Sequence, residues 1–215
     1  MKVRVITFPG SNCDKDMGQV LQESFSAKVD YTWHRDGFSD LPDLVVLPGG
    51  FSFGDYLRCG AMAKFSVAME SVQSYAKKGG KVLGVCNGFQ ILTEAGLLPG
   101  ALLHNRTLKY VCKDVDLVSD PKNPVVGNLP GKLTIPIAHG EGAYFADDAT
   151  LDRLEENGQV AFRYKVNPNG SLRDIAGITN ESGTILGMMP HPERALNSYT
   201  GKMDGKRILE SILKK

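Results

Sequence analysis

Short apolar runs alternate with segments of helical spacing through the first half of the chain. Strand-like runs occupy residues 2–8, 29–34, 43–47 and 81–85. Apolar positions recur every three or four residues over 17–25, 61–76 and 88–95, which predicts a helix in each of these segments. Apolar strands separated by helices are typical of βαβ units, so we expect a largely parallel sheet.

The second half of the chain is dominated by strand-like runs. These runs cover residues 108–118, 133–138, 160–164, 175–179 and 184–189, and the turn-forming residues 180–183 between the last two predict a hairpin. A final helix is expected with Ile208, Leu209, Ile212 and Leu213 on one face. With no internal repeat or linker, residues 1–215 are interpreted as a single α/β domain. Its mostly parallel central sheet is flanked by helices and extended by antiparallel strands.

Composition narrows the possible functions. Hydrophobic residues make up 42% and charged residues 23% of the 215, an ordinary globular balance. The 25 basic residues against 24 acidic ones give a net charge of +1, which argues against nucleic acid or a membrane as a partner bound through bulk charge. The sequence shows no signal peptide and no apolar run near the roughly 18–20 residues of a membrane span, so we expect a cytoplasmic protein. The four cysteines have no zinc-site spacing and are expected to be free thiols, with no metal site.

The segment 81–90 carries the most informative motif. An apolar strand leads into Gly84-Val85-Cys86-Asn87-Gly88, and a helix follows. This is G-x-C-x-G, the thiol version of the nucleophile elbow, in which flanking glycines permit a tight strand-to-helix turn that exposes the central residue. The helix N-terminus beside the sulfur favours its reactive anionic form. A buried structural cysteine is the alternative interpretation of this motif alone.

A second motif, Pro190-His191-Pro192-Glu193, follows the last predicted strand. Prolines on both sides restrict the backbone of His191. Glu193, two residues on, can turn back toward the imidazole and hold it in the correct tautomer, as the third member of a catalytic triad does. Taken alone, the motif is also compatible with a surface turn.

A third motif, Pro48-Gly49-Gly50-Phe51, leaves a buried strand. Its backbone N–H groups can face the edge of the sheet where ligands of α/β proteins bind. Glycines suit an oxyanion hole because no Cβ blocks the substrate oxygen. In isolation the segment is equally a plain turn.

Together these motifs resemble the class I, or triad-type, glutamine amidotransferases, whose fold is flavodoxin-like. The matching residues are Gly84 to Gln90, His191-Pro192-Glu193 and Pro48-Gly49-Gly50, in the family's order. Within that class, longer segments (8–14, 49–61, 139–142, 167–171 and 187–194) are most similar to the glutaminase subunits of phosphoribosylformylglycinamidine synthase in purine biosynthesis.

The resemblance implies a role for individual residues. Cys86 would be the nucleophile, His191 the acid and base, and Glu193 the residue that orients it. Backbone N–H groups of Gly50 or Phe51, with that of Asn87, would form the oxyanion hole. The expected contacts of the glutamine substrate are Gln90, Arg106, His139 and Glu141.

The resemblance also implies a partner. The chain has no P-loop and no room for an ATP-dependent synthetase, so the ammonia must be consumed on another polypeptide. That partner would be a PurL-like synthetase subunit that uses ATP and magnesium, with a small PurS-like subunit bridging the two. No cofactor is expected in this chain. Alternatives are an amidotransferase of another pathway, an elbow-cysteine hydrolase of the related α/β superfamily, and a non-catalytic module with the same fold.

Overall fold

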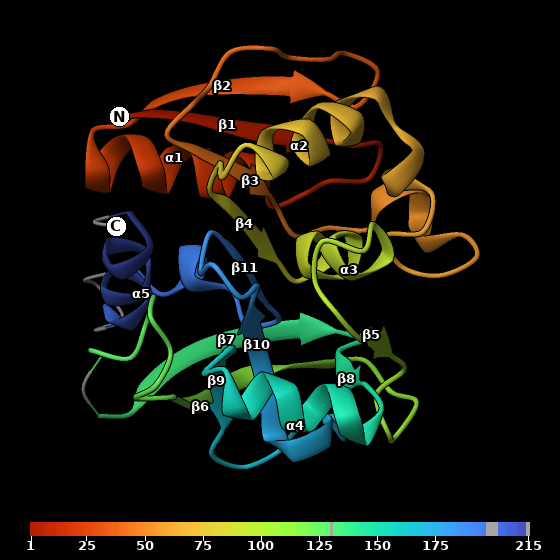
Figure 1. The fold of residues 1–215 in the computed structure, drawn as a ribbon, viewed down its shortest axis with the longest axis vertical. Coiled ribbons are helices and arrows are strands. Elements are labelled where there is room, and N and C mark those ends of the chain that lie inside the picture. Colours follow the sequence, from red (N-terminus) through yellow and green to blue (C-terminus); the bar gives the residue numbers. More distant parts are fainter. Residues whose placement is uncertain (130, 197–201, 214–215) are drawn as a thin grey trace.

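The central element of the structure is one mixed sheet. The computed structural model describes residues 1–129, 131–196 and 202–213. Within them, nine strands form a sheet in the order β2-β1-β3-β4-β11-β10-β9-β6-β7. The strands are β1 (Lys2–Thr7), β2 (Lys28–Trp33), β3 (Leu44–Leu47), β4 (Val82–Val85), β6 (Val111–Ser119), β7 (Leu133–His139), β9 (Val160–Tyr164), β10 (Ile175–Thr179) and β11 (Ile185–Met188). Figure 1 shows β1 and β2 near one end of the long axis and β6, β7 and β9 toward the other.

The sheet has a parallel half and an antiparallel half. Strands β2, β1, β3, β4 and β11 pair in parallel, and the pairs from β11 through β10, β9 and β6 to β7 are antiparallel. All residues of β3, β4 and β11 are buried, as expected for strands covered on both faces. The more and less buried residues of β7 instead alternate along the strand. This arrangement confirms the predicted fold class.

Helices contact strands of both halves of the sheet. Helix α1 (Asp14–Phe25) contacts β1 and β2, whereas α3 (Asn87–Glu94) contacts β3, β4 and β11. Helix α2 is Val67–Lys77, and α5 (Asp204–Leu213) contacts β7. The apolar stripe predicted for α5 is confirmed, since its residues Ile208, Leu209 and Ile212 are buried.

Two predicted elements differ from the structure for a reason that the backbone shows. The helix expected over 61–76 is instead a 3-10 turn, η2 (Ala63–Phe65), followed by α2. Ser66 separates them because its extended backbone (φ −78°, ψ 152°) ends the turn and its side chain caps α2 by accepting from the Met69 N–H. The strand expected from residue 108 begins only at Val111, since Leu108 has a left-handed φ of +56°.

The sequence interpretation missed three smaller elements. Strands β5 (Ala101–Leu103) and β8 (Ala143–Phe145) pair antiparallel in a separate two-stranded sheet. Helix α4 (Asp148–Glu156) begins after Asp147, whose carboxylate accepts from the Thr150 N–H, and buries Leu151 and Leu154. The N-cap residue and the two leucines three positions apart are signals that could have predicted α4.

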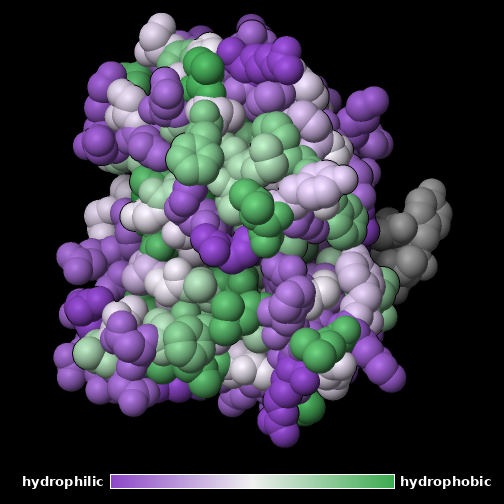
Figure 2. Space-filling view, turned by 90° about the vertical axis from the view of Figure 1, so that its right-hand side faces the viewer, coloured by the Kyte–Doolittle hydropathy of each residue, from purple (hydrophilic) through white to green (hydrophobic). Residues whose placement is uncertain are grey.

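Exposed apolar residues occur on the face of the molecule that Figure 2 presents, interspersed with hydrophilic ones. The segment 51–67 contributes several of the exposed apolar side chains, of which Tyr56 is 73% and Leu57 91% exposed. Phe53 from the same segment packs against the core, with its ring near those of Phe8 and His34. In the part of the chain that the structure describes, no helix has the length and apolar character needed to cross a membrane.

The contact between β4, α3 and β3 leaves no room for side chains at its glycines. A Cβ built on Gly88 would lie 1.9 Å from the carbonyl oxygen of Leu47, and one on Gly84 would lie 2.7 Å from the backbone of Gly88. Only glycine allows α3 to approach the sheet this closely.

We therefore expect Gly88→Ala to lower the free energy of unfolding by about 2–3 kcal/mol, because buried backbone must shift to admit the methyl group. Gly140→Ala is the matched control, since its Cβ would lie at an ordinary 3.8 Å from Tyr110. Urea unfolding monitored by circular dichroism measures both. Equal stability of the two variants would contradict the packing described here.

Candidate active site

Cys86 occupies a strained turn between β4 and α3. Its backbone has φ +50° and ψ −105°, a conformation that costs a residue other than glycine about 1–3 kcal/mol. The Cys86 N–H donates to the carbonyl of Met188 on β11 at 2.8 Å, which holds the turn against the neighbouring strand. Strain that the surrounding structure enforces at one residue is typical of functional sites. The predicted elbow is therefore present.

The sulfur of Cys86 faces the antiparallel half of the sheet. Its Sγ lies 3.8 Å from the carbonyl oxygen of Ala138 on β7. The His191 N–H donates to Pro136 of the same strand at 2.9 Å. Although β7 is an edge strand by its pairing, it contacts both motifs predicted from the sequence.

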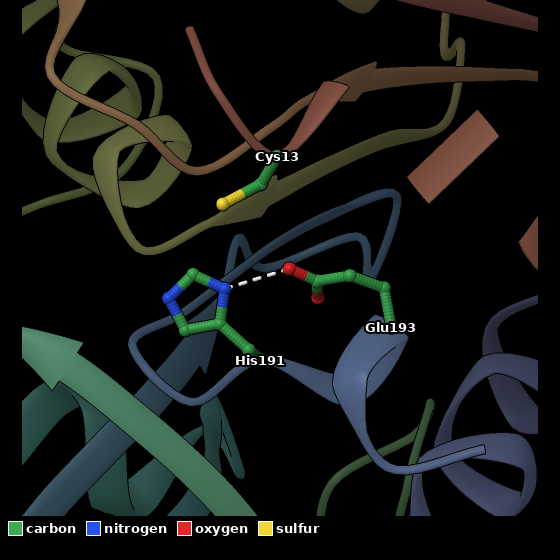
Figure 3. A group of neighbouring side chains, drawn as sticks. All are labelled: Cys13, His191 and Glu193. Carbon is green, nitrogen blue, oxygen red and sulfur yellow. Dashed lines mark hydrogen bonds and ion pairs between the residues drawn. The ribbon is translucent and has the colours of Figure 1, made fainter. Parts of the chain in front are cut away.

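His191 and Glu193 form a buried pair directly after β11. The imidazole Nδ1 lies 2.6 Å from Glu193 Oε1, and the two side chains are 3% and 0% exposed. Figure 3 shows the carboxylate reaching the ring from the short turn η4 (Pro192–Arg194). His191 Nε2 is buried and has no hydrogen-bond partner among the described residues, so it is available to a substrate.

The pKa of His191 is raised well above its ordinary value. Burial alone would lower this pKa, but the Glu193 carboxylate and the Cys86 thiol outweigh it. The proximity of the Cys13 and Cys86 thiols to the ring also raises this pKa. The structure therefore brings together the three residues predicted as a triad, since Cys86 and Glu193 both raise the pKa of His191.

The segment predicted as an oxyanion hole lies against His191 of the triad. A Cβ on Gly49 would lie 2.7 Å from His191 Cε1, so this position requires a glycine. The Phe51 N–H donates to the carbonyl of Gly10 at 2.9 Å, whereas no described acceptor is found for the Gly50 N–H. Asn87 is the first residue of α3, where N–H groups have no partner within the helix. Gly50 and Asn87 are therefore better placed as oxyanion donors than Phe51.

Two of the predicted glutamine contacts are linked directly. The Gln90 side chain on α3 donates to the Glu141 carbonyl at 2.6 Å and accepts from the Asn87 side chain at 3.0 Å. The Glu141 carboxylate lies 3.4 Å from Nδ1 of His104, an exposed histidine. Gln90 thus ties the helix that follows the nucleophile to the segment between β7 and β8.

His139, the last residue of β7, is buried beside these residues. Its Nδ1 lies 3.0 Å from Asn105 Oδ1, and its Nε2 is buried without a described partner. Burial, with the nearby His191, lowers the pKa of His139 to about 4. His139 is therefore neutral at physiological pH and can serve as a hydrogen-bonding group. Arg106 is exposed, and only its backbone N–H is fixed, by donating to the Asn169 carbonyl at 2.8 Å.

Cys13 and Arg194 are neighbours of the triad that the sequence interpretation did not identify. Cys13, expected there only to be a free thiol, is buried, and Figure 3 shows its sulfur directed at the His191 ring. Arg194 donates to Cys13 Sγ and to Asp16 Oδ2, both at 3.2 Å. A signal was available, because Cys13 closely follows β1, and the carboxyl ends of parallel strands meet at one edge of the sheet.

The remaining histidine and cysteines lie outside the triad and its neighbours. His34 packs among Trp33 and Phe53 as a buried core residue. The Cys59 thiol contacts the carboxylates of Asp55 and Glu141, and burial with these charges raises its pKa beyond the physiological range. Cys112 is an exposed free thiol on β6.

The site can therefore perform nucleophilic acyl transfer. It combines a thiol on a strained turn, an imidazole oriented by a buried carboxylate, and backbone N–H groups at a helix N-terminus. Acyl transfer through a covalent intermediate requires these four parts, namely a nucleophile, a base, an orienting group and oxyanion donors.

Comparisons with known proteins agree with this chemistry. A family model described as the CobB/CobQ-like glutamine amidotransferase domain matches residues 1–210. Proteins called phosphoribosylformylglycinamidine synthase subunit PurQ in two strains of Leptospira interrogans are 57% identical over 217 residues, covering 99% of each chain.

Solved structures give the same result. A chain in the structure of PurLQS from Thermotoga maritima is 42% identical, with a TM-score of 0.87 over 99% of this chain and 97% of that one. A glutamine amidotransferase from the same organism, 19% identical, shares the fold with a TM-score of 0.60 over 97% of this chain and 86% of that one. The chain belongs to the CobB/CobQ-like glutamine amidotransferase family.

Proposed function

We propose that the chain is the glutaminase subunit of a phosphoribosylformylglycinamidine synthase. It hydrolyses glutamine to glutamate and ammonia, and it delivers the ammonia to a separate ATP-dependent synthetase subunit in de novo purine biosynthesis. The observation that carries the proposal is the strained Cys86 turn beside the buried His191–Glu193 pair. It occurs in a chain 57% identical, over 99% of its length, to subunits of that synthase.

The first half of the reaction forms a thioester. Cys86 passes its thiol proton to His191 Nε2, and its Sγ attacks the carboxamide carbon of glutamine. The oxygen of the tetrahedral intermediate accepts hydrogen bonds from the Gly50 and Asn87 N–H groups. His191 Nε2 then donates its proton to the departing nitrogen. The carbon–nitrogen bond breaks, ammonia leaves, and a glutamyl thioester remains on Cys86.

The second half releases glutamate. Water takes the place of ammonia, and His191 removes a proton from it as it attacks the thioester carbonyl. The carbon–sulfur bond breaks, and the thiol and the imidazole return to their starting state. Gln90, His139 and Glu141, with Arg106 at the exposed side, are proposed to hold the amino-acid end of the substrate. Glu193 keeps the imidazole in one orientation throughout.

The ammonia acceptor belongs to a partner. The proposed assembly contains a PurL-like synthetase subunit, which supplies ATP and magnesium, and a small PurS-like bridging subunit. Phe51, Tyr56 and Leu57 are exposed apolar side chains on the segment that follows β3, and Phe51 is 42% exposed. The Leu57 side chain is 91% exposed, and its backbone has a left-handed φ of +72°. We propose that this segment contacts the synthetase, and that the enzyme works in the cytoplasm as one domain.

A titration tests the electrostatic role of Glu193. Because this carboxylate raises the pKa of His191, we expect Glu193→Gln to move the titration of the His191 ring to lower pH. The pair's contribution to stability is complete below the unfolded pKa and is lost as pH rises through the raised folded pKa, so this variant should lose stability mainly at acidic and neutral pH.

Nuclear magnetic resonance of the labelled histidine rings measures this shift. Asp114→Asn is the control, because that carboxylate pairs with Lys202 at 2.7 Å and does not contact His191. An unchanged His191 titration in Glu193→Gln would remove Glu193 from the triad.

Glutamate release from glutamine tests the function directly. We expect a low rate from the chain alone and a strong increase with the synthetase, its nucleotide substrate and ATP. Cys86→Ala should lose at least about 10⁴-fold of this activity, since members of a catalytic triad act as a unit. Cys112→Ala is the matched control and should retain it, because Cys112 is exposed and outside the site.

The outcomes distinguish the purine assignment from the amidotransferase chemistry. A glutaminase rate that never responds to the loaded synthetase would overturn the purine assignment and keep the amidotransferase chemistry. Full activity in Cys86→Ala would overturn the chemistry itself.

A further inference from the structure

Cys13, His191 and Glu193 form a compact group of potential metal ligands. One ligand atom from each, the thiol sulfur, an imidazole nitrogen and a carboxylate oxygen, lies within 4.8 Å of the other two, and all three residues are buried. Thiolate, imidazole and carboxylate are the ligand types of zinc. We propose that this group binds Zn²⁺, and that the bound ion switches off the active site. The inhibition rests on the proposed glutaminase function, whereas the binding does not.

The geometry requires only small side-chain movements. Tetrahedral zinc with bonds of about 2.0–2.3 Å keeps its ligand atoms roughly 3.3–3.8 Å apart. The Nδ1–Oε1 distance of 2.6 Å must open, and the sulfur already lies within 4.8 Å of the other two ligand atoms. Figure 3 shows the Cys13 sulfur above the edge of the imidazole that carries the nitrogen bonded to Glu193. The three donors therefore already converge on one point.

The carboxylate has unused bonding capacity at this point. Glu193 Oε2 is buried and has no hydrogen-bond partner among the described residues, and the side chain as a whole is 0% exposed. An unpartnered buried carboxylate oxygen is costly, and a cation would satisfy it. The Cys13 sulfur, in contrast, already accepts a hydrogen bond from the Arg194 guanidinium at 3.2 Å.

The local charges balance when zinc is bound. The Cys13 thiolate and the Glu193 carboxylate together neutralise the double charge of the ion. Arg194, whose guanidinium also touches the sulfur, is paired with Asp16 at 3.2 Å. The Cys13 thiol releases its proton to solvent on binding, and so does the imidazole where it is protonated. No oxidation or reduction is involved.

Zinc at this position would block catalysis through His191. Coordination occupies the Nδ1 lone pair, so the remaining ring proton resides on Nε2. Nε2 can then no longer take a proton from Cys86 or from water. Glu193 is also drawn away from its orienting role. The nucleophile itself need not contact the metal.

Cobalt absorption tests the binding without relying on activity. Co²⁺ is the probe, and Cys86→Ser is the background, so that the nucleophile cannot supply the sulfur ligand. We expect sulfur-to-cobalt charge-transfer and tetrahedral bands that saturate near one equivalent and disappear on adding Zn²⁺. Adding Cys13→Ala to this background should abolish them, and adding Cys112→Ser should not. Absent bands, or bands that persist without Cys13, would overturn the site.

Zinc titration of glutamate release tests the inhibition. The assay uses buffered free Zn²⁺ without added thiols, and each variant is compared with its own zinc-free rate. We expect the half-inhibitory concentration to rise at least ten-fold in Cys13→Ala and to stay unchanged in Cys112→Ser. Equal sensitivity of Cys13→Ala and the unaltered chain would place the inhibition elsewhere and contradict the proposal.

A third variant covers the case in which Cys13→Ala is unfolded, and the cobalt spectra cover the case in which the unaltered chain is inactive. Cys13→Ser, which is closer in size to cysteine, replaces Cys13→Ala if circular dichroism shows that the alanine variant is unfolded. If the unaltered chain released no glutamate under any condition, the proposed function would fail, and the cobalt spectra would still decide whether the metal site exists.

Discussion

The active site depends on one packing constraint, the close approach of α3 to the strands beneath it. The Leu47 carbonyl occupies the space where any side chain at position 88 would lie. Because α3 lies this close to the sheet, the chain must turn sharply after Val85, and Cys86 takes a left-handed φ of +50° to make that turn. The strain is offset by the buried neighbours of β4 and by the hydrogen bond to Met188. The thiol then emerges at the edge of the sheet beside a helix N-terminus.

The second requirement is that two halves of the sheet meet at this edge. Strand β11 pairs in parallel with β4 and antiparallel with β10, so it joins the two halves. The chain leaves β11 directly into the His191 turn, while β7 contacts His191 and Cys86 through Pro136 and Ala138. Nucleophile and base therefore belong to adjacent parallel strands, and the antiparallel strands close the site around them. The buried Glu193 can act on the imidazole without competition from water.

The sequence predicted those parts of the site that depend on local chain geometry. Glycines at 84 and 88 indicate the elbow because the turn cannot form without them, and prolines around His191 indicate a restricted backbone. Most strands and helices were likewise predicted from apolar spacing. The proximity of Cys13 to His191 was not predicted. The parallel strand before Cys13 indicates only the same edge of the sheet, and the closeness of the two residues depends on the order of the strands. The break at Ser66 was missed because the apolar spacing continues through it, although the capping side chain ends one element and starts the next. The contacts proposed for Arg106 stay a prediction, since its side chain is exposed.

Covalent labelling with an electrophilic glutamine analogue is the sharpest test of Cys86 as the nucleophile. 6-Diazo-5-oxonorleucine carries the amino-acid end of glutamine and alkylates a nucleophile positioned where the carboxamide is attacked. Intact mass followed by peptide mapping gives the number and position of the adducts. We expect one adduct, on Cys86, which glutamine protects. An adduct on Cys13, Cys59 or Cys112, or labelling of Cys86 that glutamine does not slow, would contradict this assignment.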